Sequence, residues 1–399
     1  MSLEMDERKS AIILGGHYAS LPIARSLLRQ GYSVYCHDQA RDPVALRCNG
    51  VMALAPEPRD DNLLDKIREQ CEHTDSKPIL FVTSDAYLKF LGDHFDALKQ
   101  CCYFPYPEVS MVEALLDKQK SHGAFASVGL PVPDTQAIER GSDLALCLKA
   151  PIVLKPLVQT DWTLNCEAML VTNQRKVLFF GTIETAAKAV SELNSYGPMV
   201  AQSFIPGGDD CLYYYVGYRG QNGKMLASCG NRKISTLQEG MGSETHLVTG
   251  SPADVTSLGE HVFEALDIKG VAGVDIKRDA RTGKLYVIEV NYRFGLSDGI
   301  LLASGLDLPK LYAEECSGQA LLPAVSGIKT THWIWLIPDL ARCFKSPKML
   351  FKRLARLSLW ALKGELSINE FPHSDPLSGL RILVKEATGY AINSFKRSW

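Results

Sequence analysis

An acid and an amide lie two residues apart in the segment V287-I-E-V-N-Y-R-F-G295, whose composition favours a β-strand. Side chains at positions i and i+2 of a strand share a face, so Glu289 and Asn291 point the same way. Ile288 and Val290 are expected to point into a core on the other face. Carboxylate and amide oxygens held side by side are donors that hard cations prefer.

A second strand-like segment, G273-V-D-I-K277, precedes this one, and the residues between the two indicate a turn. Folding the two segments into a hairpin brings Asp275 opposite Glu289 and position 276 opposite position 288. Two carboxylates and the neighbouring amide then converge on one face, which suits Mg²⁺ carrying nucleotide phosphates. An ordinary solvent-facing polar row on a two-stranded edge is the alternative interpretation.

Arg293 follows two residues after Asn291 and is expected on the same face. A cation beside the carboxylates could form a simple salt bridge. It could equally hold an anionic substrate next to the metal.

The composition limits the class of protein. A chain of 399 residues is expected to form two or three domains, and 46% hydrophobic with 22% charged residues is typical of a globular protein. The net charge of −2 predicts no nucleic-acid partner. The chain starts with polar and charged residues, so no secretory signal is predicted. Its apolar runs are far shorter than the ~20 residues that cross a bilayer, so no membrane span is predicted.

Eleven cysteines occur without any C-x-x-C pair, and only Cys101 and Cys102 are adjacent. This pattern predicts reduced, mostly buried thiols in a cytoplasmic protein rather than a disulfide framework or a zinc site.

The N-terminal region alternates strand-like and helix-like patterns, which predicts a mostly parallel sheet. The strand-like segments are residues 11–16, 33–38, 51–55 and 79–84, and the helix-like ones are 21–29 and 60–72. The turn G15-G-H-Y-A-S20 lacks the third glycine of a dinucleotide fingerprint, which disfavours a nicotinamide-dependent oxidoreductase.

A second unit begins near residue 110 with a predicted helix over residues 111–120. Strand-like segments follow at residues 151–156, 198–210 and 212–218, the second of them ending in a Gly-rich turn. Lys155 protrudes from the apolar run of the first segment. The glycine-rich segment E239-G-M-G-S-E-T245 could close over a ligand as a lid, or it could be a disordered surface turn.

Residues 328–399 differ from the rest in charge, because no acidic residue occurs between Asp339 and Glu365. The basic residues of that interval are Arg342, Lys345, Lys348, Lys352, Arg353, Arg356 and Lys363. A helical apolar stripe lies among them, formed by Leu350, Phe351, Leu354, Leu357 and Trp360. The pattern indicates either a helix that packs on its own protein with a basic outer face, or one that rests on an anionic membrane.

The order of these features resembles the ATP-grasp superfamily over about residues 10–320, and is most similar to the ATP-grasp carboxylate–amine ligases found among cell-surface glycan biosynthesis enzymes. The tail motif S374-D-P-L-S-G379 is similar to that group as well. The resemblance implies an α/β and α+β architecture. Its expected parts are a Rossmann-like parallel sheet at 1–108 that serves the substrate, two ATP-grasp subdomains at 109–200 and 201–327, and a basic helical C-terminal extension at 328–399.

The resemblance implies that ATP binds between the two subdomains, with its phosphates on two lysines. Lys155 matches one of these lysines, and Lys118 matches the other, with Lys120 as its close rival. The segment Q202-S-F-I-P-G-G-D209 matches the hinge that holds the adenine. The groups expected around the nucleoside are the Gln202 carbonyl, the backbone at Ser203 and Ile205, the Phe204 ring, and either Asp209 or Asp210 on the ribose hydroxyls.

Asp275, Glu289 and Asn291 match the metal ligands of the superfamily, which implies Mg²⁺ as cofactor, expected as two ions, with Mn²⁺ as a substitute. Arg293 matches a position that contacts the substrate or the transferring phosphoryl group. Either Arg232 or Lys233 matches the basic site that steadies the acyl phosphate.

In this superfamily the N-terminal sheet commonly helps to hold the substrate that is not a nucleotide. Ligands collect at the carboxyl ends of parallel strands. Gly16, His17 and Asp85 follow such strand ends and are therefore expected near that substrate.

The implied activity is an ATP-dependent ligase that converts a carboxylate into an acyl phosphate and couples it to an amine or a thiol, releasing ADP and phosphate. Such catalysis consists of positioning and charge neutralisation and needs no side-chain nucleophile. Carboxylation, thioester formation and a non-catalytic ATP-binding module are the alternatives.

The expected partners are small-molecule carboxylate and amine substrates, including a glycan or lipid-linked precursor, and the resemblance allows a homodimer. The expected location is the cytoplasm, with peripheral membrane contact through residues 340–364 as an open alternative.

Overall fold

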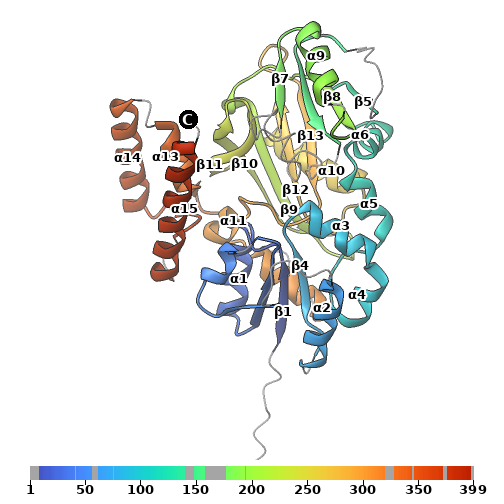
Figure 1. Cartoon of the computed structure of the whole chain (residues 1–399), viewed down its shortest axis with the longest axis vertical. Coiled ribbons are helices and arrows are strands. Elements are labelled where there is room, and N and C mark those ends of the chain that lie inside the picture. Colours follow the sequence, from blue (N-terminus) through green and yellow to red (C-terminus); the bar gives the residue numbers. More distant parts are fainter. Residues whose placement is uncertain are drawn as a thin grey trace, which may run out of the picture.

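The computed structural model describes residues 9–40, 42–55, 62–74, 76–139, 148–157, 177–193, 195–319, 328–343, 346–371 and 375–396, without the side chains of 118–119 and 389–396. The strands of these ranges form three sheets. In Figure 1 the N-terminal sheet lies at the bottom, the large sheet in the middle and the small sheet at the top. No helix in this described part is long and apolar enough to cross a membrane.

The N-terminal sheet is parallel throughout, as predicted. In spatial order its strands are β3 (Val51–Ala53), β2 (Ser33–His37), β1 (Ser10–Leu14) and β4 (Ile79–Val82). Helices α1 (Ser20–Arg29) and α2 (Leu63–Glu72) cover its two faces, because Ile13 packs in one cluster with α1 and Ile12 in another with α2. Burial on both faces explains the unbroken apolar runs of β1 and β4.

Short helices connect this sheet to the next unit. They are α3 (Asp85–Asp93), α4 (Phe95–Cys101), α5 (Val109–Leu116) and α6 (Lys118–Ser127). The short helix η1 (Val44–Arg47) lies earlier, between β2 and β3. The single helix predicted over residues 111–120 is instead interrupted at Asp117. The Asp117 carboxylate accepts a hydrogen bond from the Lys120 N–H at 3.0 Å, so this residue begins a new helix as its N-cap.

The small sheet is antiparallel, and one of its faces packs on α9 (Ile183–Leu193). In spatial order its strands are β5 (Thr135–Ile138), β8 (Met199–Ser203), β6 (Ile152–Pro156) and β7 (Leu178–Phe180). The expected boundary between residues 200 and 201 falls inside β8, because pairing with β6 continues to Ser203.

The large sheet has the order β13-β12-β9-β10-β11-β14-β15. Its strands are β9 (Leu212–Arg219), β10 (Met225–Gln238), β11 (Met241–Thr249), β12 (Gly270–Arg278), β13 (Leu285–Asn291), β14 (His332–Ile334) and β15 (Leu366–Ile368). The helical segments between them are η2 (Asp209–Cys211), α10 (Ala253–Ala265), α11 (Gly299–Ser304) and α12 (Leu308–Cys316).

The segment 239–245 is not a free loop, contrary to both interpretations of the sequence. Strand β10 ends at Gln238 and β11 begins at Met241, so only two residues form the turn between them. Gly240 adopts a φ of +73°, which glycine tolerates best, and this allows the tight reversal.

The C-terminal segment is part of the large sheet, because β14 pairs with β11 and β15 pairs with β14. It also contributes α13 (Leu336–Cys343), α14 (Pro347–Leu362) and α15 (Pro376–Lys396). Figure 1 shows these three helices grouped beside α11 and the β10–β11 hairpin, on the left of the molecule.

Two residues of the apolar stripe of α14, Phe351 and Leu354, are 76% and 45% exposed, so they do not pack on the protein as the first interpretation requires. The face that packs on the protein instead contains Arg353 and Leu357, four residues apart. The buried Arg353 guanidinium donates to both carboxylate oxygens of Asp339 at 2.6 and 2.7 Å. A buried arginine therefore ties this helix to α13.

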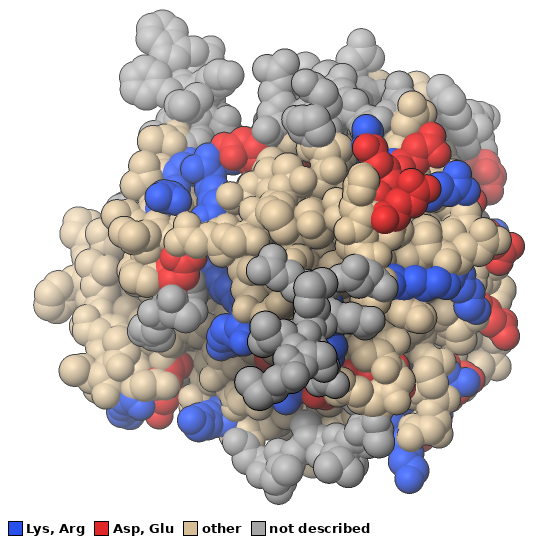
Figure 2. Space-filling model, turned by 90° about the horizontal axis from the view of Figure 1, so that it is seen from below, with Lys and Arg blue, Asp and Glu red and all other residues tan. Residues whose placement is uncertain are grey.

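Charges of both signs are interspersed over the face seen from below in Figure 2. No extended region of one sign covers the described residues on this face, in agreement with the net charge of −2.

Replacement of Asp339 by alanine should lower the free energy of unfolding by about 3–5 kcal/mol, because it leaves the buried Arg353 charge without its carboxylate. Urea denaturation followed by fluorescence measures this change. The matched control is Arg356→Ala on the exposed side of α14, which should shift stability by no more than about 0.5 kcal/mol. Equal effects of the two substitutions would contradict the anchoring role of the ion pair.

Candidate active site

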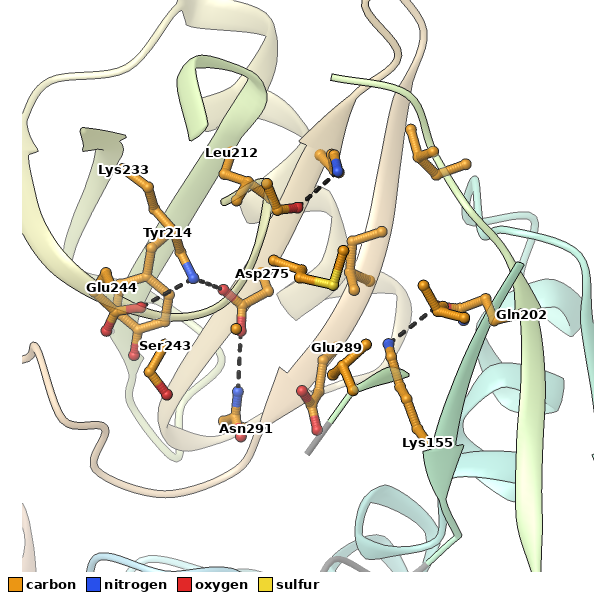
Figure 3. Close-up of a pocket in the computed structure, with 18 of the residues that line it drawn as sticks. Lys155, Gln202, Leu212, Tyr214, Lys233, Ser243, Glu244, Asp275, Glu289 and Asn291 are labelled. Carbon is orange, nitrogen blue, oxygen red and sulfur yellow. Dashed lines mark hydrogen bonds and ion pairs between the residues drawn. The ribbon is translucent and has the colours of Figure 1, made fainter. Parts of the chain in front are cut away.

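A cavity of about 240 Å³ separates the small sheet from the large one. In Figure 3, Lys155 and Gln202 project from the small sheet toward side chains that rise from the large sheet. The labelled side chains on the large-sheet side are Leu212, Tyr214, Lys233, Ser243, Glu244, Asp275, Glu289 and Asn291. The cavity therefore joins the two units that the sequence predicts to hold a nucleotide between them.

The hairpin formed by β12 and β13 pairs Asp275 with Glu289, as the sequence predicts. The prediction fails one residue later, because Ile276 pairs with Val287 and not with residue 288. A β-bulge adds the extra residue, which turns Ile288 from the expected core into the cavity wall.

Asn291 lies beside Asp275 in the same cavity, with its Nδ2 3.4 Å from Asp275 Oδ2 (Figure 3). Among the described residues, none donates a hydrogen bond to the Glu289 carboxylate, whose oxygens remain available to a cation. A half-turn of the Asn291 amide exchanges its nitrogen and oxygen, which would add an oxygen donor. The donor set of these three residues therefore fits a hard divalent ion.

Lys233 is buried between two carboxylates, with Nζ 2.6 Å from Asp275 Oδ1 and 2.9 Å from Glu244 Oε2. Burial by itself lowers the pKa of Lys233, but the two carboxylates outweigh burial and raise that pKa above its ordinary value. The lysine is therefore a permanent cation.

The two carboxylates respond differently to their surroundings. Burial raises the pKa of Asp275 more than Lys233 lowers it, whereas for Glu244 the effects of Lys233 and the Ser297 hydroxyl prevail over burial and the pKa falls. Of these two carboxylates, Asp275 is therefore the one whose charged form a further cation would stabilise most.

Arg232 precedes Lys233 on β10 and points to the opposite face, where it is exposed. Its charge acts on His332 of β14, whose pKa it helps to lower, after burial and Arg353. The structure thus brings Lys233 into the cavity and leaves Arg232 outside, a choice that the sequence left open.

Arg293 connects the metal-ligand candidates to the N-terminal unit. Its Nε donates to Asp85 Oδ1 at 2.5 Å, and one terminal nitrogen donates to Asn291 Oδ1 at 3.2 Å. Asp85 is the first residue of α3, directly after β4, so the expectation that it lies near the site agrees with this geometry. Both interpretations of Arg293 from the sequence agree with the structure, because Arg293 forms a salt bridge and also lines the cavity.

Lys155 donates to the Gln202 carbonyl oxygen at 3.0 Å (Figure 3). The Gln202 Nε2 donates to Thr135 Oγ1 at 3.0 Å and lies 3.2 Å from His122 Nε2. The Gln202 carbonyl oxygen, which was expected to accept a hydrogen bond from adenine, therefore accepts one from Lys155, the residue expected to bind phosphate. The side chain of Lys118 lies outside the described part of the chain, and its rival Lys120 lines a neighbouring cavity.

The hinge lines the cavity as predicted, through Ser203, Phe204 and Ile205. The Ser203 and Phe204 N–H groups donate to the carbonyls of Asp134 and Pro151 at 2.8 and 3.0 Å. These two donors stabilise the hinge itself and are not directed at a ligand.

Lys277 lies across the hinge, with Nζ 4.3 Å from the centre of the Phe204 ring and 2.8 Å from the Gly240 carbonyl oxygen. Burial lowers the pKa of Lys277 to about 8, because the low-dielectric surroundings disfavour its charged form. The sequence interpretation missed this residue, although its spacing of two from Asp275 on one strand was a usable signal.

Asp209 and Asp210 do not line the cavity, contrary to the expected contact with ribose hydroxyls. Asp209 accepts hydrogen bonds from Thr236 Oγ1 at 2.6 Å and from the Gly240 N–H at 2.7 Å, and it pairs with Arg342 at 3.2 Å. Asp210 is exposed. Asp209 braces the β10–β11 hairpin from outside and has no free oxygen for a sugar.

Gly16 and His17 are engaged by the N-terminal unit and line neither of the two cavities described here. The Gly16 N–H donates to Asp38 Oδ2 at 2.5 Å, and His17 Nε2 lies 3.3 Å from Thr83 Oγ1. The structure therefore does not bring these two candidates to the metal-ligand residues, unlike Asp85.

Tyr214 and Glu244 are further cavity residues that sequence reasoning missed. The Tyr214 hydroxyl donates to Asp298 Oδ1 at 2.8 Å, and a Cβ on Gly273 would lie 2.1 Å from that hydroxyl oxygen, so glycine is required there. Glu244 belongs to the segment that was expected to be a loop, so no strand periodicity could indicate its direction.

A second cavity of about 510 Å³ adjoins the first and shares five lining residues with it: Lys155, Gln202, Ile288, Glu289 and Asn291. Its other walls come from α3, α5 and α6, including Asp85, Glu113 and Lys120. The metal-ligand candidates thus stand between two compartments, one at the hinge and one against the N-terminal unit.

Comparison with known proteins finds a family model that matches part of this chain and a relative of low sequence identity. Residues 115–297 match a family described as the ATP-grasp domain. A D-aspartate ligase of Enterococcus faecium (strain Aus0004) is 21% identical over 323 residues, which are 76% of this chain and 76% of that relative.

Two solved structures share the fold at low sequence identity. The ADP complex of an N5-carboxyaminoimidazole ribonucleotide synthetase has a TM-score of 0.64 at 13% identity, covering 89% of this chain and 88% of its own. The L-amino acid ligase from Bacillus licheniformis has a TM-score of 0.59 at 18% identity, covering 82% and 79%.

The titration of Lys277 should make the free energy of unfolding rise with pH between the folded-state pKa of about 8 and the ordinary value of 10.5. In this window the unfolded chain retains the proton that the folded protein has released, so deprotonation favours folding. Thermal unfolding across this pH range should show wild type gaining stability relative to Lys277→Met. The exposed Lys284→Met on the same hairpin is the control and should run parallel to wild type. A Lys277→Met curve that also runs parallel would show that the buried lysine keeps an ordinary pKa.

Proposed function

Because this chain carries the ATP-grasp fold, we propose that it is an ATP-dependent ligase that joins a carboxylate to an amine. The observation that carries the proposal is the convergence of Asp275, Glu289 and Asn291 on the cavity that Lys155 enters from the opposite sheet. Oxygen donors facing a lysine across a cleft suit a nucleotide polyphosphate with its divalent cation.

In the proposed reaction a carboxylate oxygen of the substrate attacks the γ-phosphorus of ATP, ADP leaves, and an acyl phosphate forms. The amine nitrogen then attacks the acyl carbon, phosphate leaves with the C–O bond pair, and the nitrogen loses a proton to give the amide. A bound divalent ion, Mg²⁺ or Mn²⁺, would neutralise phosphate charge, and Asp275, Glu289 and Asn291 would hold it. The protein supplies orientation and fixed charge, and no covalent intermediate on a side chain is required.

Three cationic residues of the cavity, Lys155, Arg293 and Lys233, have separate tasks in this mechanism. Lys155 faces the polyphosphate from the small sheet. Arg293, held by Asp85 and Asn291, presents its guanidinium where the two cavities meet and would stabilise the transferring phosphoryl group. Lys233 is engaged by two carboxylates, so its task is to orient Asp275 and not to contact the acyl phosphate directly.

The hinge cavity would take the nucleoside, and the adjoining larger cavity would take the carboxylate and the amine. The relatives named as D-aspartate ligase and L-amino acid ligase support an amino acid as one of the two substrates. Acidic side chains in the second cavity, including Asp85 and Glu113, favour a cationic amine group there. A glycan or lipid-linked precursor is the proposed second substrate class.

Carboxylation of a nitrogen is the second candidate, because an N5-carboxyaminoimidazole ribonucleotide synthetase shares the fold. It would use bicarbonate as the acid that receives the phosphoryl group. The size of the second cavity favours a larger acid over bicarbonate.

Release of ADP should depend on adding both an acid and an amine from panels of amino acids and sugar acids, and mass spectrometry should detect the amide. Glu289→Gln should reduce this release on the order of 10²–10³-fold, because it removes a charge that the cation needs. Glu113→Gln, in the other compartment, should raise the KM for the amine with a smaller change in kcat. ADP release that requires only bicarbonate and an amine would favour carboxylation, and unchanged release by Glu289→Gln would refute the metal assignment.

We also propose that α14 rests on an anionic membrane surface, where a lipid-linked substrate would be found. Phe351, Leu359 and Leu362 are 76%, 49% and 86% exposed and lie on the side of the helix opposite Arg353 and Leu357. The exposed Lys348 and Lys352 flank them, and the complementary charge is that of anionic headgroups.

The protein should sediment with anionic vesicles at low salt and much less with neutral ones. The double substitution Phe351→Ser and Leu362→Ser should abolish most of this binding, since it removes the inserted apolar surface. Val128→Ser, which alters an apolar residue that is 41% exposed directly after α6, is the control. Binding that is unaffected by the double substitution, or absent altogether, would return α14 to a purely structural role.

A further inference from the structure

Three cysteines meet where α2 and α4 pack together in the N-terminal unit. Cys71 lies in the last turn of α2, Cys101 is the last residue of α4, and Cys102 follows it. Their sulfur atoms all lie within 4.8 Å of one another. The Sγ of Cys102 is 3.8 Å from that of Cys71 and 4.0 Å from that of Cys101. In Figure 1, α2 and α4 are neighbours at the lower right.

These distances are those of thiolates that share one metal ion. A zinc–sulfur bond is about 2.3 Å long, so the sulfurs around one ion stand about 3.8 Å apart in a tetrahedron and about 4.0 Å apart in a trigonal plane. The separations of 3.8 and 4.0 Å lie within this range. A disulfide would need a separation of about 2.05 Å instead.

We propose that Cys71, Cys101 and Cys102 bind a thiophilic divalent ion of the Zn²⁺ class, with a fourth position left to solvent. Each thiol would release a proton as its sulfur binds the ion.

The burial of the three thiols is graded in a way that suits such a site. Cys102 is 1% exposed, whereas Cys71 and Cys101 are partly exposed and leave a route for the ion. The buried sulfur would be the inner ligand and the other two would close over the ion. No other group of histidine, cysteine or acidic side chains among the described residues brings three ligand atoms this close together.

An ion at this position would fasten α2 to α4. The α2 helix covers the sheet, and α4 follows α3, whose first residue Asp85 pairs with Arg293 of the active site. The proposed role is therefore structural support for the N-terminal unit and not participation in the ligase reaction.

The test uses the full chain, reduced and freed of metal, and titrates it with Co²⁺ as a coloured substitute for Zn²⁺. Thiolate-to-cobalt charge-transfer absorption should saturate at one ion per chain and disappear when Zn²⁺ is added. This absorption arises from sulfur ligands alone, so an ion at Asp275 or Glu289 does not contribute to it. Cys71→Ser and Cys101→Ser, both partly exposed, should each weaken Zn²⁺ binding by at least about 100-fold against a chromophoric chelator.

Cys343→Ser is the matched control, because Cys343 is also partly exposed and lies apart from the three. It should bind Zn²⁺ as wild type does, and the melting temperature of wild type and control, but not of Cys71→Ser, should rise with Zn²⁺. Absence of charge-transfer absorption in folded wild-type protein would overturn the proposal. Detection of a Cys71–Cys102 disulfide in a protein that binds no ion when reduced would overturn it as well.

Discussion

The active-site cavity depends on one buried cation, Lys233, held between Glu244 and Asp275. Three buried charges of this kind are costly to desolvate, and they are tolerated only when each is paired. The pairing ties β10 and β11 to β12 and fixes the side of the strand to which Asp275 points. Because Asp275 faces Glu289 across the hairpin, the same lysine indirectly positions the proposed cation site.

The outer side of this sheet is braced by the C-terminal segment. Arg342 of α13 pairs with Asp209, which also holds the turn at Gly240, and Arg353 of α14 pairs with Asp339. The Gly240 carbonyl in turn receives the Lys277 ammonium inside the cavity. Arg342 and Arg353, which the sequence analysis counted among basic residues of an outer face, thus form ion pairs that stabilise the hairpin on one side of the cavity.

The N-terminal unit reaches the same site through Arg293, which pairs with Asp85 at the start of α3. This contact joins the cleft at the hinge to the compartment expected for the acid and the amine. The arrangement connects the metal-ligand candidates to the position of the N-terminal sheet, so a shift of that unit would change the surroundings of those residues.

Strand periodicity in the sequence determined the parallel N-terminal sheet and the hairpin with Asp275 opposite Glu289, because alternation along a strand is a local property. The same reasoning from periodicity did not predict the position of Ile288, where a bulge shifts the register. It also did not predict that Arg353, and not Phe351, is buried on α14. Only the tertiary structure showed that Lys233, and not Arg232, lies in the cavity. It also directed Asp209 to the turn at Gly240 and placed Cys71 beside Cys101 and Cys102. Those outcomes depend on which strands and helices become neighbours, and contacts between residues distant in the chain leave no periodic pattern in the sequence.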